Sequence, residues 1–281
     1  MDLTTIIGII LGGILITFGI VFDMEAGVDF AKMINFLDVP SVLIVVGGTL
    51  EAVGASYPAS MLKQIPKHMK IILDDKKFKP MEYIDLLVEF SQIARKNGLL
   101  ALEEKANQQT DPFLKQSIML IVDATDPEKV KSILANDLDY LADRHAEGVG
   151  MYEKASAYAP AFGMIGTLIG LVNMLKGMSL DSGTGTSSLG ADMSVALITT
   201  FYGCVMANLI FMPIAKKLSV RNDEEYLCKQ IIIEGVLSIQ SGENPKFMKE
   251  KLISYLEQRQ RDAANGEGTP GKVKKGRKDK E

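Results

Sequence analysis

The sequence predicts an all-α, polytopic membrane protein with four transmembrane helices and a helical cytoplasmic domain. Three observations support this class. The 281-residue chain is 47% hydrophobic yet 23% charged, so the two kinds of residue must be concentrated in different segments. Four apolar segments each approach the ~20 residues that cross a ~30 Å hydrocarbon layer. Lys and Arg gather in two of the segments outside them.

The first apolar segment, Leu3 to Phe22, contains only threonines as polar side chains. A signal peptide is the alternative, but the segment lacks a basic leader and is too long for the apolar region of such a peptide. The other three run from Val39 to Tyr57, from Ala155 to Leu175 and from Met193 to Ile214. All four are long enough to span a bilayer.

The distribution of basic residues predicts the orientation. Of 31 Lys and Arg residues, 13 lie between Ser60 and Gly150 and 15 between Lys216 and Glu281. Because basic residues near the ends of spans favour the cytoplasmic side, both large segments and both termini are expected there.

Helix start and stop signals organise the cytoplasmic part. Pro80 is expected to open a helix that ends at Gly98, and Asp111 before Pro112 combines a capping side chain with a proline in the first turn. Asp126 before Pro127 repeats the signal. The helical period continues from there without a proline until Pro160, so this helix is expected to run directly into the third span.

These patterns predict five regions along the chain. They are transmembrane helices 1 and 2 with a short outer loop over 1–58, a cytoplasmic helical domain over 59–154, transmembrane helices 3 and 4 over 155–216, a cytoplasmic C-terminal helix over 217–260 and a disordered basic tail over 261–281.

No motif indicates an enzyme, a cofactor, a metal site or a nucleic-acid partner. His68 and His145 are the only histidines, and neither has metal-ligand spacing around it. The segment 266–272 resembles a phosphate-binding loop, but Val273 replaces the Ser or Thr that contacts the metal, and no strand precedes it. For the basic tail, a solvated end is favoured over contact with anionic lipid.

Polar side chains inside apolar segments are costly and often functional. Thr167, Thr199 and Thr200 lie within the third and fourth segments, where they could line a pore or simply bond to carbonyl groups one turn earlier. Glu51 is the only carboxylate well inside a span; an ion-carrying role is the less favoured interpretation. Glycines or alanines four residues apart predict packing seams within or between subunits: Gly8 with Gly12, Gly166 with Gly170, and Gly203 with Ala207.

Two apolar segments and one cytoplasmic loop resemble the MotA/TolQ/ExbB proton channel family. The segments are Tyr158-Ala159-Pro160-Ala161-Phe162-Gly163-Met164-Ile165-Gly166-Thr167-Leu168-Ile169-Gly170-Leu171 and Ala196-Leu197-Ile198-Thr199-Thr200-Phe201-Tyr202-Gly203. The loop Arg95-Lys96-Asn97-Gly98-Leu99-Leu100-Ala101-Leu102-Glu103 matches a motif of the flagellar branch that ExbB and TolQ lack.

The resemblance implies a subunit of the flagellar stator. Such subunits form a homopentamer around a dimer of MotB, which supplies the ion-binding aspartate, and they convert ion-motive force into torque on the rotor. Thr167 and Thr200 would then line the ion pathway, and Pro160 and Pro213 would couple ion passage to conformational change, since proline permits a kink. Arg95 and Glu103 would engage the rotor switch protein FliG.

Alternatives stay open at this point. An ExbB/TolQ-type energy-transducing subunit is the second hypothesis, and a solute transporter is the third, although no internal repeat supports it. Thr167 stands where many proton-driven members have alanine, and the Thr167 and Thr200 pair also occurs in sodium-driven ones. Either coupling ion is therefore compatible with these residues, with a weak preference for protons.

Overall fold

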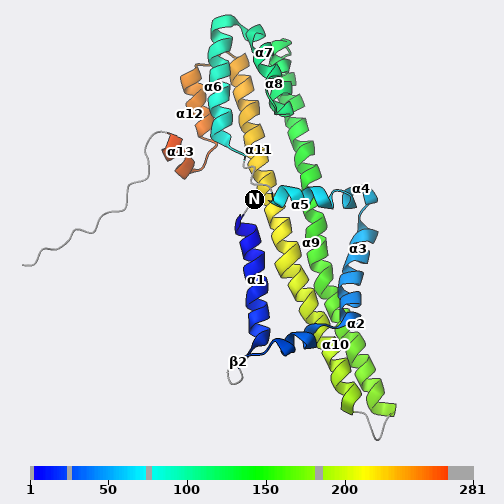
Figure 1. Cartoon of the computed structure of the whole chain (residues 1–281). Helices are drawn as coiled ribbons and strands as arrows, with labels where there is room; N and C mark the ends of the chain where they lie inside the picture. Colours follow the sequence, from blue (N-terminus) through cyan, green and yellow to red (C-terminus); the bar gives the residue numbers. More distant parts are fainter. Residues whose placement is uncertain (1–2, 24–26, 74–77, 181–185, 265–281) are drawn as a thin grey trace, which may run out of the picture. The chain divides into compact units, whose positions relative to one another are not determined.

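The computed structural model describes residues 3–23, 27–73, 78–180 and 186–264 (Figure 1). The described residues form two compact units, which we call the apolar unit and the polar unit. The apolar unit comprises Met1–Lys76 and Asp143–Asn222, and the polar unit comprises Lys77–Ala142 and Asp223–Glu281. Two long helices, α9 (Pro127–Leu180) and α11 (Met212–Gln240), contribute residues to both units.

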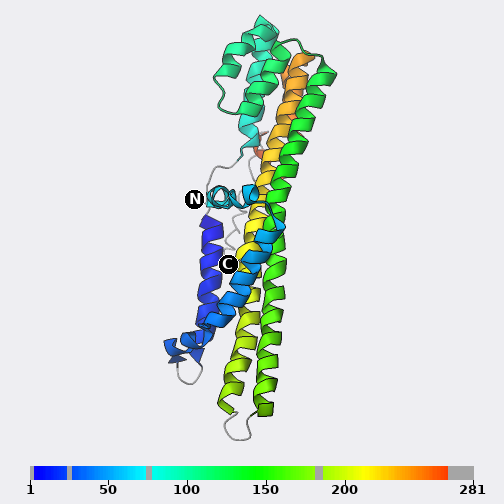
Figure 2. The same ribbon diagram turned by 90° about the vertical axis from the view of Figure 1, so that its right-hand side faces the viewer.

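The apolar unit is helical apart from one pair of two-residue antiparallel strands, β1 (Phe22–Asp23) and β2 (Gly27–Val28). Its other elements are α1 (Leu3–Val21), η1 (Phe30–Phe36), α2 (Val39–Val42), η2 (Leu43–Gly47), α3 (Gly48–Ser56), α4 (Ala59–Leu62), α5 (Ile65–Leu73), α10 (Thr186–Val205) and η4 (Met206–Phe211). Figures 1 and 2 show α10 lying antiparallel beside the later part of α9.

Three helical stretches in the described residues are long and apolar enough to cross a membrane. They are Val39–Ser56, formed by α2, η2 and α3 in succession, and parts of Pro127–Gly177 and Leu189–Gln240. The described side chains of α1 add a shorter apolar helix, Ile7–Val21. The helical membrane class is therefore confirmed, whereas the count of four spans stays a prediction.

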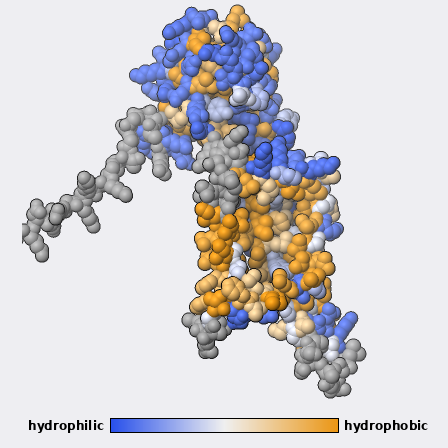
Figure 3. All heavy atoms as spheres, in the orientation of Figure 1, coloured by the Kyte–Doolittle hydropathy of each residue, from blue (hydrophilic) through white to orange (hydrophobic). Residues whose placement is uncertain are grey.

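The surface of the apolar unit is hydrophobic over its helices, while that of the polar unit is mostly hydrophilic (Figure 3). Leu15, Leu168 and Leu197 are each more than 60% exposed. Soluble proteins rarely expose so many large apolar side chains together, whereas a lipid environment solvates them without cost. The exposed leucines are therefore consistent with helices that contact lipid or other membrane helices.

The polar unit packs further helices against the parts of α9 and α11 that belong to it. These are α6 (Pro80–Asn97), η3 (Leu99–Ala101), α7 (Leu102–Asn107), α8 (Pro112–Val122), α12 (Pro245–Ile253) and α13 (Gln258–Ala264). One hydrophobic core is shared by all of these except α13, and its fully buried side chains include Phe90, Leu102, Ile118, Leu134 and Ile232.

The predicted helix starts of this unit are confirmed. The Asp111 carboxylate accepts a hydrogen bond from the amide of Phe113 at 2.9 Å, and the Asp126 carboxylate accepts from the amides of the two residues after Pro127. The Tyr83 hydroxyl donates to the other oxygen of Asp111, and burial together with this bond raises the pKa of Tyr83. The predicted continuation of α9 past Pro160 is also confirmed.

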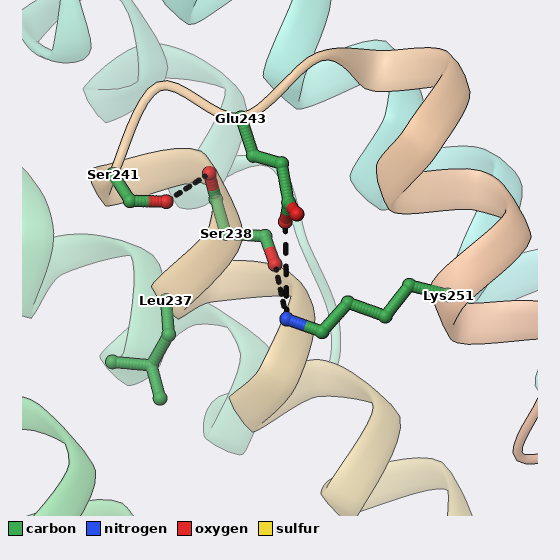
Figure 4. A pocket seen from close by; sticks show the side chains of 5 residues that line it. All are labelled: Leu237, Ser238, Ser241, Glu243 and Lys251. Atoms are coloured by element: carbon green, nitrogen blue, oxygen red, sulfur yellow. Dashed lines mark hydrogen bonds and ion pairs between the residues drawn. The ribbon is translucent and has the colours of Figure 1, made fainter.

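The C-terminal part differs from the single helix that was expected over 217–260. The helix α11 ends at Gln240, the chain turns through Gly242 at a positive φ of 72°, and α12 begins at Pro245. At this turn the Lys251 ammonium group donates to the Ser238 hydroxyl at 3.4 Å and pairs with Glu243 at 3.8 Å (Figure 4).

Lys251 also pairs with Glu234, and this hydrogen bond is the main cause of its raised pKa. A depression of about 440 Å³ is lined by Leu237, Ser238, Ser241, Glu243 and Lys251. The lysine charge in it is already compensated by Glu243 and Glu234. We therefore interpret these ion pairs as structural contacts that hold α12 against α11. The helix α13 extends to Ala264, so the first four residues of the tail predicted over 261–281 are helical rather than disordered, and residues 265–281 lie outside the described residues.

Candidate functional site

Glycines bring α9 and α10 into close contact. A Cβ atom added at Gly163 would lie 3.0 Å from the Thr199 carbonyl oxygen, and one added at Gly170 would lie 2.6 Å from that of Asp192. At Gly166 the added atom would lie 2.4 Å from the Thr199 side chain. Any side chain at these positions would force the helices apart, so the seam depends on residues that lack one.

The opposite helix contributes to the same seam. A Cβ atom at Gly203 of α10 would lie 2.6 Å from the Ala159 carbonyl oxygen and 3.1 Å from Cα of Pro160. The seam predicted at Gly166, Gly170 and Gly203 therefore forms within the chain. Of the pair predicted in the first segment, Gly12 also packs within the chain, because a Cβ atom added there would lie 2.6 Å from the Leu209 side chain, whereas nothing lies within 4 Å of such an atom at Gly8.

Thr167 and Thr200 meet across this seam. Their hydroxyl oxygens are 2.6 Å apart, although 33 residues separate them in the sequence. The Thr167 hydroxyl also lies 2.9 Å from the Ala196 carbonyl oxygen and 3.1 Å from that of Gly163, and the Thr200 hydroxyl lies 3.3 Å from Ala196. The hydroxyls therefore bond to carbonyl groups one turn earlier, as one of the two sequence interpretations predicted, and also to each other, while the pore-lining interpretation stays a prediction.

A count of protons shows what this pair can still bind. Each hydroxyl carries one proton and two acceptor lone pairs, so two protons serve four possible contacts. In one arrangement, the Thr167 hydroxyl donates to the Ala196 carbonyl oxygen and the Thr200 hydroxyl donates to Thr167. In the other, the Thr167 hydroxyl donates to Thr200 and the Thr200 hydroxyl donates to the Ala196 carbonyl oxygen. In either arrangement Thr200 keeps at least one lone pair available, and its side chain is exposed. The pair can therefore accept a hydrogen bond or coordinate a cation at Thr200.

Thr199 differs from Thr200 in its burial and in its hydrogen bonds. Its side chain is fully buried against Gly166, and its hydroxyl donates to the carbonyl oxygens of Val195 at 2.9 Å or Ala196 at 3.1 Å on its own helix. Thr199 thus serves packing, whereas Thr200 offers a polar group on the exposed face.

Both prolines lie at irregular points of the long helices. Pro160 is half-buried inside α9, where it cannot donate to the carbonyl group one turn earlier, and Gly203 packs directly on it. Pro213 follows the π-helical segment η4, in which the Met212 amide donates to the Ala207 carbonyl five residues back. Such segments occur where a proline or an inserted residue disturbs the regular ladder, often at functional sites.

The sequence did not indicate a second irregular segment, η2, or the contact that follows it. A Cβ atom at Gly48 would lie 2.2 Å from the Phe162 ring, so Val39–Ser56 packs closely on α9 through this glycine. Glu51 lies on the same stretch but is exposed.

Both histidines form hydrogen bonds with neighbouring side chains. The Tyr152 hydroxyl and Nδ1 of His68 share a hydrogen bond of 3.3 Å, and the Nδ1 group of His145 donates to the Asn222 side chain at 2.9 Å. Burial lowers the pKa of His68, and the nearby Lys67 and His145 lower it further, so the ring is neutral at pH 7. Within the described ranges, no group of three or more His, Cys, Asp or Glu side chains could hold a metal ion.

Arg95 and Glu103 lie on either side of a tight turn in the polar unit. Arg95 is in the last turn of α6, Glu103 is in the first turn of α7, and Gly98 between them has a positive φ of 83°. Both charged side chains are exposed. A neighbouring pair, Lys105 with Glu89 at 3.7 Å, links the two helices one step away. In the part of the chain that the structure describes, neither Arg95 nor Glu103 joins such a pair.

These features define a class: a helical membrane protein in which two apolar helices pack through glycine and hold a hydroxyl pair at their contact. Residues 105–231 match the MotA/TolQ/ExbB proton channel family. The chain is also 42% identical over 230 residues to Motility protein A of Borreliella burgdorferi, covering 82% of this chain and 86% of the relative. The chain belongs to this channel family and to no enzyme class.

Two further comparisons extend over almost the whole chain. Chemotaxis protein PomA of Vibrio alginolyticus is 38% identical over 261 residues, covering 93% of this chain and 98% of the relative. The structure of the flagellar MotAB stator complex from Bacillus subtilis aligns with a TM-score of 0.81 at 31% identity, covering 94% of this chain and 99% of the matched chain.

The seam generates a direct prediction. Replacing Gly203 by alanine puts a methyl group against the Ala159 backbone, so we expect α9 and α10 to separate and the protein to lose roughly 1–3 kcal/mol of stability, the usual cost of overpacking. Gly190→Ala on the same helix is the matched control, because nothing lies within 4 Å of Gly190. Thermal unfolding of the purified protein measures both. Equal melting temperatures for the two variants would contradict the close contact.

Proposed function

We propose that this chain is a stator subunit of the bacterial flagellar motor, forming with a MotB partner an ion channel that turns ion-motive force into torque. The observation that carries the proposal is the Thr167 and Thr200 pair, which presents an open oxygen on the exposed face of an otherwise apolar helix. Relatives named Motility protein A and PomA support it.

The partner follows from what the Thr167 and Thr200 pair lacks. The Thr167 and Thr200 pair can accept hydrogen bonds, but hydroxyl groups do not titrate near neutral pH and cannot by themselves take up protons. We infer that a dimer of MotB supplies the aspartate that binds the ion, within a homopentamer of this chain. The matched Bacillus subtilis structure is titled as a MotAB complex, which supports this pairing. The exposed apolar side chains of α9 and α10 offer surfaces for such neighbours and for lipid.

Conformational coupling is assigned to the two prolines. Pro160 removes a hydrogen bond from α9 at the point where Gly203 packs on it, and Pro213 follows a π-helical turn. Helices bend most readily at such points, so a change in ion occupancy beside Thr200 can be relayed as a change of helix angle.

The outward charges of the polar unit provide the rotor contact. Arg95 and Glu103 are exposed on a rigid turn, and charges on an exposed rim govern encounter and specificity more than stability. We assign them to the rotor switch protein FliG. The distribution of basic residues supports a bacterial inner-membrane location with both termini in the cytoplasm.

The first test removes the open oxygen. Thr200→Val deletes one hydroxyl at nearly unchanged volume, so we expect ion flux through the complex with MotB to fall by up to roughly tenfold, because the loss of one hydrogen bond costs up to about 1.5 kcal/mol. The matched control is Thr199→Val, which removes a hydroxyl bonded only within its own helix and should leave flux nearly unchanged. Flux into vesicles measures both, and unchanged flux in the Thr200 variant would contradict the proposed pathway.

The second test reverses a charge on the turn. Arg95→Glu should reduce motor torque severalfold while the melting temperature and ion flux of the purified complex stay within error, because the residue is exposed and makes no ion pair in the described structure. An opposite charge change on FliG should restore part of the torque. Arg95 would instead be a structural residue if the variant complex failed to assemble.

A further inference from the structure

The turn between α6 and α7 displays one large apolar side chain between its charges. Leu100 is 74% exposed, more than any other large hydrophobic residue given for the polar unit. An isolated exposed leucine is ordinary on a protein surface, so exposure alone does not indicate a contact. Two further observations indicate a contact: the turn fixes the position of Leu100, and charged side chains flank it.

The turn holds Leu100 in a fixed position. Gly98 adopts a positive φ of 83°, which strongly favours glycine, and it closes α6 by donating its amide to the Ala94 carbonyl at 2.9 Å. On either side of Leu100, Leu99 packs against the core and Leu102 is fully buried. Because its neighbours anchor the segment, little conformational entropy remains to be lost when a partner binds Leu100.

Charges of opposite sign flank this apolar centre. Arg95 and Lys96 end α6 before it, and Glu103 and Glu104 begin α7 after it. All four side chains are exposed. This arrangement, an apolar anchor within a polar rim, is the usual anatomy of a protein interface.

We propose that Leu100 is the apolar anchor of the rotor contact and inserts into a hydrophobic pocket on the rotor switch protein. An acidic group beside the pocket would face Arg95, and a basic group would face Glu103. This arrangement places opposite charges against each other across the contact. The proposal rests on the proposed function and deepens it: charge steers the encounter, and burial of Leu100 holds the engaged state.

The test uses the full chain together with its MotB partner in cells that lack the native subunit. Leu100→Ala should shorten the time for which a stator stays engaged at the rotor by about tenfold, because truncation removes most of the apolar contact. Leu100→Gln should shorten it equally, although it keeps the side-chain length. Leu100→Met, which remains apolar, should retain most of the engagement. Phe247→Ala is the matched control, because Phe247 is 60% exposed on α12, away from the turn.

Dwell time and torque are read from bead rotation, and melting temperature and ion flux are read from the purified complex. Normal dwell times for Leu100→Ala and Leu100→Gln, with impaired torque in Arg95→Glu, would overturn the anchor while leaving the proposed function intact. A lowered melting temperature in both Leu100 variants would also overturn it, since Leu100 would then belong to the fold. Normal torque in the Arg95 and Leu100 variants alike would remove the rotor function of this turn altogether.

Discussion

The contact between α9 and α10 is the constraint on which the apolar unit depends. Membrane helices gain little from burying apolar side chains against each other, since lipid solvates them equally well, and close backbone packing must take over that role. Gly163, Gly166 and Gly170 on one helix and Gly203 on the other supply it. The hydroxyl pair is a consequence, because two threonine oxygens come within 2.6 Å only when the backbones approach this closely.

The same seam connects ion chemistry with helix geometry. Gly203 of α10 lies against Pro160 of α9. The proline that removes a hydrogen bond from α9 is therefore also a point of close contact between the two helices. One turn along α10, Thr200 carries the open oxygen. A conformational change at the proline and a change of occupancy at the hydroxyl therefore act on the same few contacts. This shared set of contacts is the physical basis for coupling within the unit.

Much of this fold could be predicted from local signals. Asp111 and Asp126 before prolines marked helix starts because capping is a local interaction, and the absence of proline between Pro127 and Pro160 marked a continuous helix. The π-helical segments could not be predicted, since no local pattern in the sequence marks the change to hydrogen bonds five residues apart. Likewise, the sequence indicated that Thr167 and Thr200 share one ion pathway, but their hydrogen bond depends on how two helices pack, as does the approach of Gly48 to Phe162.

The most direct measurement of the central claim is a double-mutant cycle between Thr167 and Thr200 on ion flux. If the two hydroxyls act as one unit, Thr167→Val and Thr200→Val should each reduce flux roughly tenfold, and the double variant should be no more than about twofold worse than either, because removing one partner already breaks the pair. If the hydroxyls act independently, the losses would multiply to about a hundredfold. That multiplicative result would contradict the account.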